Sequence, residues 1–199
     1  MTSPHPFSEY VFSAQEGFDE AATRAAFAHA IPLKTLVIYC LDPRVTEIPH
    51  AVARFMGGQT YPGEVITNEH GQRVGSTTEV ATVAVAAGRA IDALRSVTVL
   101  EHLFGVETVV VVHHSNCGAT SYSAHGIVDA FRKENGADIS AAYDHGSVCI
   151  DDFEASLAYD VALLRRSPGV PMHADILGLF YNTDTGELTE VVRDAGTPR

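Results

Sequence analysis

The sequence predicts an α/β fold in which helices flank a mostly parallel central sheet. Short apolar runs rich in β-branched residues alternate along the chain with longer segments of helical periodicity. The two clearest strand candidates, residues 33–40 and 106–112, end next to Cys, His, Asp and Arg side chains. Because ligands of open parallel sheets gather at the carboxyl ends of the strands, this edge is also the expected functional site.

The N-terminal half predicts helices, strands and a hairpin in turn. Residues 14–30 are rich in Ala, with Phe18 and Phe27 near one stripe, and Pro32 ends this helix. The elements expected after it are a strand at 33–40, a helix at 45–56, one arm of a hairpin at 64–68 and an apolar strand at 79–85.

The C-terminal half continues the alternation. A helical pattern over 90–104 ends at Gly105, a residue that commonly follows the last turn of a helix. Acids begin the segment 151–166 and arginines end it, as the helix dipole favours. The expected elements are helices at 90–104, 119–133 and 151–166, a strand at 106–112, and a closing hairpin of 173–181 and 188–192 around a turn at 183–186.

Composition narrows the class of protein. The chain has 199 residues, which suits a single domain over 1–199. Its formal charge of −12 argues against nucleic-acid binding, since phosphate contacts need clustered Lys and Arg. No basic amphipathic stretch favours a membrane surface, no apolar run approaches the ~18–20 residues of a membrane span, and the first residues do not resemble a signal peptide. We therefore expect a cytoplasmic protein.

Cys40, His114 and Cys117 form the candidate metal site. Cys40 ends the first strand, and His114 and Cys117 follow the Val-rich one. Each cysteine alone would more often be a small buried hydrophobe, but two such strand ends together are hard to explain by packing. Two thiolates and an imidazole suit zinc, and three protein ligands leave a fourth position for water.

Asp42 and Arg44 flank this site. Without a functional role, the two residues would form an ordinary structural ion pair. Beside a metal, Arg44 would keep Asp42 ionised, and Asp42 would orient the nucleophile by accepting its hydrogen bond. In the alternative arrangement, Asp42 is itself the fourth metal ligand and closes the site.

The neighbouring residues have weaker assignments. His113 should point away from the site, because successive side chains of a strand alternate. Backbone N–H groups of Ser115 and Asn116 are expected to bond the thiolates. The remaining assignments are Cys149 as a free thiol, His102 as a structural residue, and Tyr61, His70 and Tyr122 as residues of a pocket or its rim.

The pattern Cys40-x-Asp42-x-Arg44 with His113-His114-x-x-Cys117-Gly118 resembles the signature of the β-carbonic anhydrases. The likeness extends over 88–96 and 100–105, which resemble the family's helix before the third strand, and over 177–191, which resembles the tail of its short His-His-type branch. It implies one zinc per chain on Cys40, His114 and Cys117, and a catalytic dyad of Asp42 and Arg44. It also implies a homodimer, often paired into tetramers, with an N-terminal helical arm at 1–32 that embraces the partner.

Two departures from the family pattern concern the substrate pocket. The family usually has Arg-Asn-Ala-Gly after the second strand, whereas 84–88 here reads Ala-Val-Ala-Ala-Gly. In addition, 57–75 is predicted to be an insertion between the first two strands. The zinc chemistry is thus expected to be intact and the pocket altered.

The resemblance implies that zinc hydroxide attacks a small linear heterocumulene. Carbonyl sulfide would give carbon dioxide and hydrogen sulfide, and carbon dioxide would give bicarbonate. Sulfur is larger and more polarisable than oxygen, so the less polar wall favours carbonyl sulfide slightly. Two other classes of protein stay open. One is a closed, non-catalytic zinc scaffold. The other is a redox-responsive protein that loses zinc on oxidation, although this hypothesis gives the Asp42–Arg44 pair no function.

Overall fold

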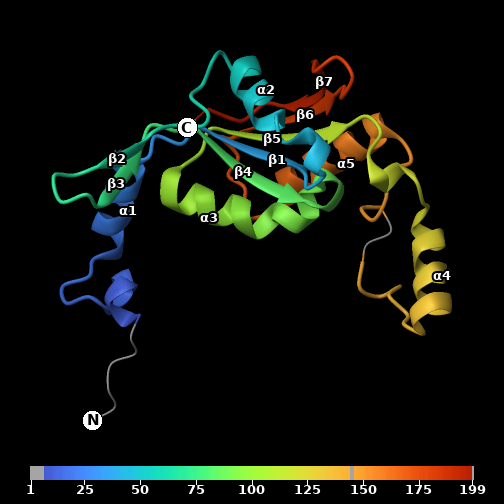
Figure 1. The fold of residues 1–199 in the computed structure, drawn as a ribbon, viewed down its shortest axis with the longest axis horizontal. Coiled ribbons are helices and arrows are strands. Elements are labelled where there is room, and N and C mark those ends of the chain that lie inside the picture. Colours follow the sequence, from blue (N-terminus) through green and yellow to red (C-terminus); the bar gives the residue numbers. More distant parts are fainter. Residues whose placement is uncertain (1–6, 144–145, 199) are drawn as a thin grey trace, which may run out of the picture.

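A five-stranded sheet forms the centre of the protein. The computed structural model describes residues 7–143 and 146–198. The strands lie in the order β4–β1–β5–β6–β7, and the first four are parallel while β7 pairs antiparallel at one edge (Figure 1). The prediction of a mostly parallel sheet is therefore confirmed. The bounds are Thr35–Cys40 for β1, Val80–Val85 for β4, Thr108–His114 for β5, Asp175–Tyr181 for β6 and Leu188–Asp194 for β7.

Helices cover both faces of this sheet. Helix α2 (Ile48–Phe55) packs on one face, and α3 (Leu94–Phe104) and α5 (Phe153–Arg166) lie along the other (Figure 1). Side chains of the buried strands alternate between the two layers, so Val110 packs toward α2 and Val109 toward α5. Both layers are almost entirely aliphatic, as a chain without Trp requires.

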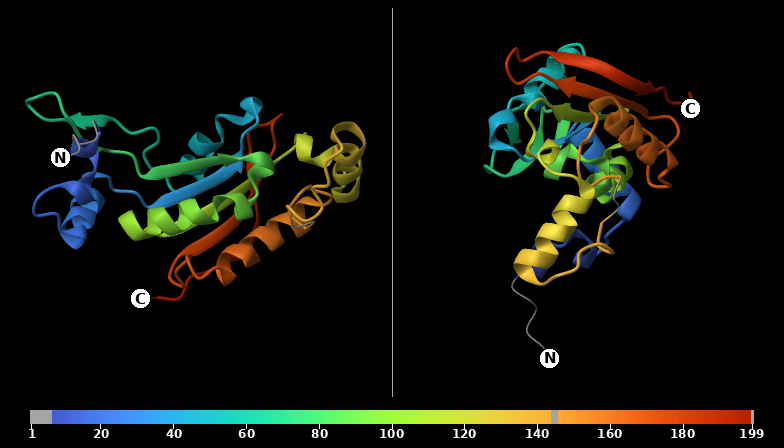
Figure 2. Two further views of the ribbon diagram at one scale, coloured as in Figure 1. Left: turned by 90° about the horizontal axis from the view of Figure 1, so that it is seen from below. Right: turned by 90° about the vertical axis from the view of Figure 1, so that its right-hand side faces the viewer.

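Two appendages extend from opposite ends of the body (Figures 1 and 2). At one end, α1 (Glu20–Ala30) contacts α3 and buries none of its own side chains. Beside it, β2 (Val65–Thr67) and β3 (Arg73–Ser76) form a separate two-stranded sheet, which confirms the predicted hairpin. At the other end, α4 (Ala124–Asn135) projects past the carboxyl ends of the parallel strands.

Two predicted helices have different bounds because their caps lie elsewhere. The helix expected at 14–30 begins at Glu20, where the Asp19 carboxylate accepts the N–H of Ala22. The helix expected at 119–133 is α4, which begins after Ser123, whose hydroxyl accepts the N–H of Gly126. Residues 118–123, before it, form a short 3-10 turn and a loop.

The domain organisation expected from the sequence is a single unit with an N-terminal arm and an insertion. The assignments of 1–199 as one domain, 1–32 as an arm and 57–75 as an insertion stay predictions, and residues 1–6 of the arm lie outside the described residues. Across the part of the chain that the structure describes, none of the helices has the length and apolar character needed to cross a bilayer.

Candidate metal centre

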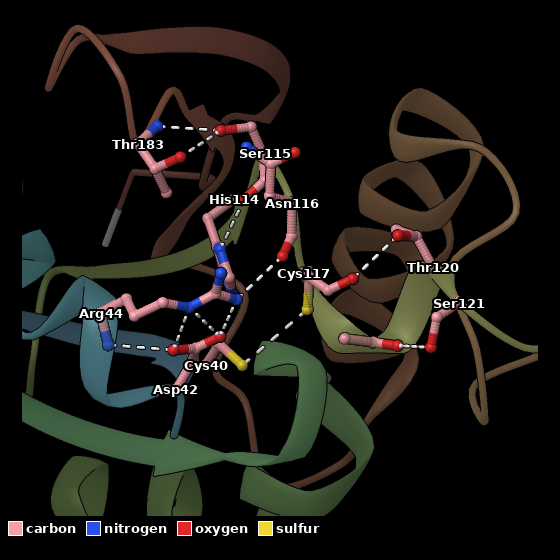
Figure 3. Close-up of polar contacts among 11 residues, drawn as sticks. Cys40, Asp42, Arg44, His114, Ser115, Asn116, Cys117, Thr120, Ser121 and Thr183 are labelled. Carbon is pink, nitrogen blue, oxygen red and sulfur yellow. Dashed lines mark hydrogen bonds and ion pairs between the residues drawn. The ribbon is translucent and has the colours of Figure 1, made fainter.

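Cys40, His114 and Cys117 converge at the carboxyl edge of the sheet (Figure 3). Cys40 ends β1 and His114 ends the adjacent strand β5, so parallel pairing brings the two residues together. Cys117 follows in the loop after β5. The two sulfur atoms are 3.9 Å apart, and the donor atoms of all three side chains lie within 4.8 Å of one another. All three residues are buried.

The orientation of His114 leaves one ring nitrogen aimed at this group. Nδ1 lies 2.9 Å from the carbonyl oxygen of Ser115, to which an N–H at that position donates. Nε2 is buried and has no nitrogen or oxygen partner, and its interaction is with the sulfur of Cys40, a weak partner for a buried imidazole nitrogen. Tetrahedral zinc with bonds of about 2.3 Å to sulfur places two thiolates about 3.8 Å apart. The residues therefore fit zinc in both spacing and donor type.

The two thiols are coupled to each other. Hydrogen bonding from the Cys117 thiol lowers the pKa of Cys40 to about 4, and the same contact raises the pKa of Cys117. Backbone N–H groups also act here, since that of Asp42 lowers the pKa of Cys40 and that of Ala119 lowers the pKa of Cys117. The prediction that Ser115 supplies such a group is wrong, because its N–H donates to the carbonyl of Tyr181 at 3.0 Å.

Arg44 holds the carboxylate of Asp42 next to the candidate ligands (Figure 3). Its Nη2 lies 2.6 Å from Oδ2 of Asp42 and 3.0 Å from the carbonyl oxygen of Asn116. These contacts, with the backbone N–H of Arg44, hold the pKa of Asp42 well below its usual range. Asp42 is not part of the group of converging donor atoms. Within the described residues, the Asp42 carboxylate faces Arg44, and the converging donor atoms are those of Cys40, His114 and Cys117.

Strained backbone surrounds this edge. Ala87 and Asn116 have φ of 58° and 57°, and they are the non-glycine residues with positive φ in the described chain. Both adjoin the site, Asn116 between two candidate ligands and Ala87 in the pocket wall. Such conformations cost free energy and occur most often at functional sites. Gly88 is also left-handed, and a Cβ there would lie 2.7 Å from the carbonyl oxygen of Val112.

A cavity of about 600 Å³ opens beside the converging side chains. Its polar groups are Asp42 and Arg44, and Tyr122 lies on its rim, as predicted. Ala86, Ala87 and Tyr122 also border an adjoining cavity of about 440 Å³ beneath α4. The apolar wall of the first cavity consists of Leu41, Pro43, Ala86, Ala87, Gly118 and Ala119.

The other residues singled out from the sequence lie away from the cavity. Tyr61 packs edge-on against His50, and His70 lies exposed in the β2–β3 hairpin beside Glu69, so neither lines it. His102 contacts Arg24 and Glu20 of α1, in keeping with a structural role. Cys149 is a buried free thiol.

His113 belongs to a buried ionic cluster that sequence reasoning missed. As predicted, it points away from the cavity, and its Nε2 lies 3.2 Å from Oδ2 of Asp160 on α5. Arg89 donates to the same carboxylate at 2.9 Å and 3.2 Å. Arg89 and Asp160 are 71 positions apart and belong to no recognisable motif, so no local pattern pointed to this pairing.

Sequence comparison finds similarity over about half of the chain. No family model matches the sequence. A carbon disulfide hydrolase of Acidithiobacillus thiooxidans is 27% identical over 112 residues, which are 49% of this chain and 56% of that protein. β-Carbonic anhydrase 1 of Mycobacterium tuberculosis is 24% identical over 100 residues, 50% of this chain and 59% of that protein. The matched stretch thus spans little more than half the length of these relatives.

Solved structures match over most of the chain. The carbonic anhydrase of Streptococcus mutans superposes with a TM-score of 0.60 at 23% identity, covering 96% of this chain and all of that one. The apo form of a carbon disulfide hydrolase gives a TM-score of 0.58 at 20% identity, covering 92% of this chain and 91% of that one. The fold is therefore that of the β-carbonic anhydrases.

Proposed function

We propose that this chain, which belongs to the β-carbonic-anhydrase family, is a zinc enzyme that adds water to a small linear heterocumulene. The observation that supports this most directly is the convergence of two buried sulfur atoms and Nε2 of His114 beside the Asp42–Arg44 pair. A buried group of this composition favours a metal, because without one the imidazole nitrogen has only the weakly bonding sulfur of Cys40 as a partner.

Cys40, His114 and Cys117 are the proposed ligands of one zinc ion per chain. When bound, zinc supplies Lewis acidity that brings the pKa of water toward ~7. The hydrogen bond from Nδ1 of His114 to Ser115 fixes the ring so that Nε2 faces the two sulfurs. Ser115 is held in turn by Thr183, with 2.8 Å between the two hydroxyl oxygens (Figure 3).

Asp42 and Arg44 are the proposed catalytic pair. Because Arg44 keeps Asp42 ionised, the carboxylate can accept a hydrogen bond but cannot donate one. It would therefore accept a hydrogen bond from the attacking oxygen and so direct the oxygen lone pair toward the substrate. Arg44 also contacts the carbonyl of Asn116, so the pair is held to the loop between His114 and Cys117.

We infer that the substrate contains sulfur, with carbonyl sulfide as the preferred molecule. At Ala86, where the family pattern has Asn, the cavity wall offers an apolar side chain, and a polarisable sulfur loses little by contacting it. The similarity to a carbon disulfide hydrolase supports the same class of substrate. In the balanced reaction, carbonyl sulfide and water give carbon dioxide and hydrogen sulfide: one C–O bond forms, the C–S bond breaks, and both water protons end on sulfur.

Hydration of carbon dioxide is the second candidate reaction. The similarity to β-carbonic anhydrase 1 favours it, and the same Asp42–Arg44 pair would serve it. A closed, non-catalytic scaffold has less support, since Arg44 engages both carboxylate oxygens of Asp42. A redox-responsive protein stays the least favoured reading, because it assigns the pair no function.

We further propose that the enzyme acts in the cytoplasm as a homodimer, which a second pairing would make a homotetramer. Phe7, Tyr10 and Phe12 are more than half exposed, and α1 buries none of its side chains. Exposed aromatic side chains of this kind favour burial against a second copy.

A side-by-side assay of both gases tests the proposed function. We expect the zinc-loaded protein to turn over carbonyl sulfide with a higher kcat/KM than carbon dioxide. Cys40→Ser should lose both activities and its zinc, whereas Cys149→Ser, a matched change at a buried cysteine outside the site, should keep both. Activity that survives Cys40→Ser would contradict the metal assignment. A far higher turnover of carbon dioxide would overturn the substrate preference alone.

A further inference from the structure

Arg89 is the largest fully buried side chain of the described protein and the centre of a polar cluster. Its guanidinium makes two bonds to the Asp160 carboxylate, at 2.9 Å and 3.2 Å. It also donates to the carbonyl oxygens of Cys149 at 2.8 Å and Gly146 at 3.1 Å. None of these groups lines the cavity beside Cys40 and Cys117.

We propose that Arg89 and Asp160 are positioning residues for the metal centre, which hold His114 and Cys117 at the spacing that zinc requires. This inference rests on the proposed function in so far as that function assigns zinc to this site. The cluster reaches the candidate ligands by two routes.

The first route leads to Cys117. Arg89 fixes the carbonyl of Cys149, and the next residue, Ile150, donates its N–H to the carbonyl of Ala119 at 3.0 Å. Ala119 in turn directs its own N–H to the sulfur of Cys117. Removing the guanidinium would release residues 146–150, and with them the loop that presents Cys117.

The second route leads to His114 and Cys40. The Asp160 carboxylate accepts a hydrogen bond from Nε2 of His113, the residue directly before His114 on β5. Arg89 also directly follows Gly88, where a Cβ would lie 3.1 Å from the backbone N of Cys40. A shift at Arg89 would therefore displace the ends of both strands that supply candidate ligands.

Stability alone gives a weak reason for such a cluster. A buried ion pair recovers little more than the desolvation cost of its charges, and well-packed apolar residues often serve as well. Arg does offer a rigid fork of donors, which here satisfies one carboxylate and two carbonyls in fixed directions. Hydrogen bonds in fixed directions are suited to a side chain that holds the surrounding backbone segments in defined positions.

The test compares two arginines. Arg165 on α5 is also tied to a carboxylate and to backbone carbonyls, those of Asp194, Pro171, Met172 and Ala174, but far along the helix from the candidate ligands. Arg89→Lys and Arg165→Lys are therefore matched losses of a guanidinium fork. Zinc affinity is measured by competition with a chelating dye, and the Co²⁺-loaded proteins are examined by their thiolate charge-transfer absorption.

We expect Arg89→Lys to weaken zinc binding about 10-fold or more and to shift the Co²⁺ spectrum. Asp160→Asn, a nearly isosteric change, should do the same in lesser degree. Arg165→Lys should alter thermal stability while leaving the zinc affinity and the spectrum unchanged. Equal zinc affinities in Arg89→Lys and Arg165→Lys would overturn the inference, and if the wild type fails to bind zinc, it is the proposed function that fails.

A second measurement needs no variant. Because coupling between sites is reciprocal, zinc binding to the wild-type protein should protect the amides of Ala119 and Ile150 from hydrogen exchange. The amides of residues 172–174, a segment whose carbonyls accept from Arg165, should show no such change. If zinc leaves the exchange of Ile150 unaltered, the first route does not exist, and the inference is wrong even where the substituted proteins fail to fold.

Discussion

The guanidinium of Arg44 contacts both carboxylate oxygens of Asp42, with Nε 3.0 Å from Oδ1 and Nη2 2.6 Å from Oδ2. This contact decides the charge and the direction of the one carboxylate beside the converging sulfurs. It also keeps that carboxylate out of the group of candidate metal ligands. Under the proposed function, Cys40, His114 and Cys117 would bind the metal, and Asp42 would act only in catalysis.

Asp42→Asn should therefore separate these two roles. We expect turnover to fall about 100-fold or more, because the neutral amide is a weaker hydrogen-bond acceptor than the carboxylate and its NH2 group cannot accept from Arg44, so the attacking oxygen is no longer oriented. Zinc content should stay near that of the wild type. Asp138→Asn, at an exposed aspartate also paired with an arginine, Arg132, should leave turnover unchanged. Loss of zinc from Asp42→Asn would show that Asp42 is a ligand.

Gly88 offers a test of how tightly the strand ends are packed. It has positive φ, as has Gly136, but an added Cβ would meet the Val112 carbonyl oxygen at 2.7 Å at Gly88 and nothing within 4 Å at Gly136. Both changes to Ala incur the left-handed backbone cost of about 1–2 kcal/mol. Gly88→Ala should cost about 1–3 kcal/mol more, since the neighbouring backbone must move. Urea denaturation measures the difference, and equal costs would contradict the close packing.

The apolar wall at Ala86 should control the choice of substrate. Ala86→Asn restores a polar amide at the rim of the cavity, where the family pattern has one. We expect kcat/KM for carbonyl sulfide to fall several-fold relative to that for carbon dioxide. Ala142→Asn, which borders only the adjoining cavity, is the control and should leave the ratio unchanged. A ratio that Ala86→Asn leaves unaltered would remove the physical basis of the sulfur preference.

The Lys34–Glu79 pair links stability to pH. Lys34 lowers the pKa of Glu79, and the N–H of Thr60 acts in the same direction. A carboxylate whose pKa is lower in the folded state stabilises the protein above its unfolded pKa of about 4.3, and this stabilisation is lost as the pH falls through the folded value. Glu79→Gln should lower the melting temperature by about 1–4 °C at pH 7.

That deficit should shrink as the pH is lowered below about 4, because the wild-type carboxyl then becomes neutral as well. Lys34→Gln should reproduce part of the deficit at pH 7, since it removes the partner. Differential scanning calorimetry of the three proteins between pH 3 and 7 measures the effect. A deficit that stays constant over this range would show that the charge of Glu79 does not stabilise the fold.

The sequence by itself determined the class of fold and the composition of the candidate site. Strand and helix periods depend on side chains close together in the chain, so β1, β5 and α5 were predicted near their observed positions. Parallel strands end at a common edge, and this rule placed Cys40 near His114 before any coordinates were considered. Helix starts were predicted less well, because Asp19 and Ser123 each begin a helix through a single capping hydrogen bond.

Only the tertiary structure decided what surrounds and supports these residues. The direction of the Asp42 carboxylate is set by its contact with Arg44, which follows the end of the strand. The Arg89–Asp160–His113 cluster joins three elements that are distant in the chain, and its bonds exist only once α5 packs on β5. The physical reason is the distance along the chain over which each property is decided. Periodicity and motif spacing depend on residues close together in sequence. Burial, desolvation and hydrogen-bond direction depend on which distant segments come into contact.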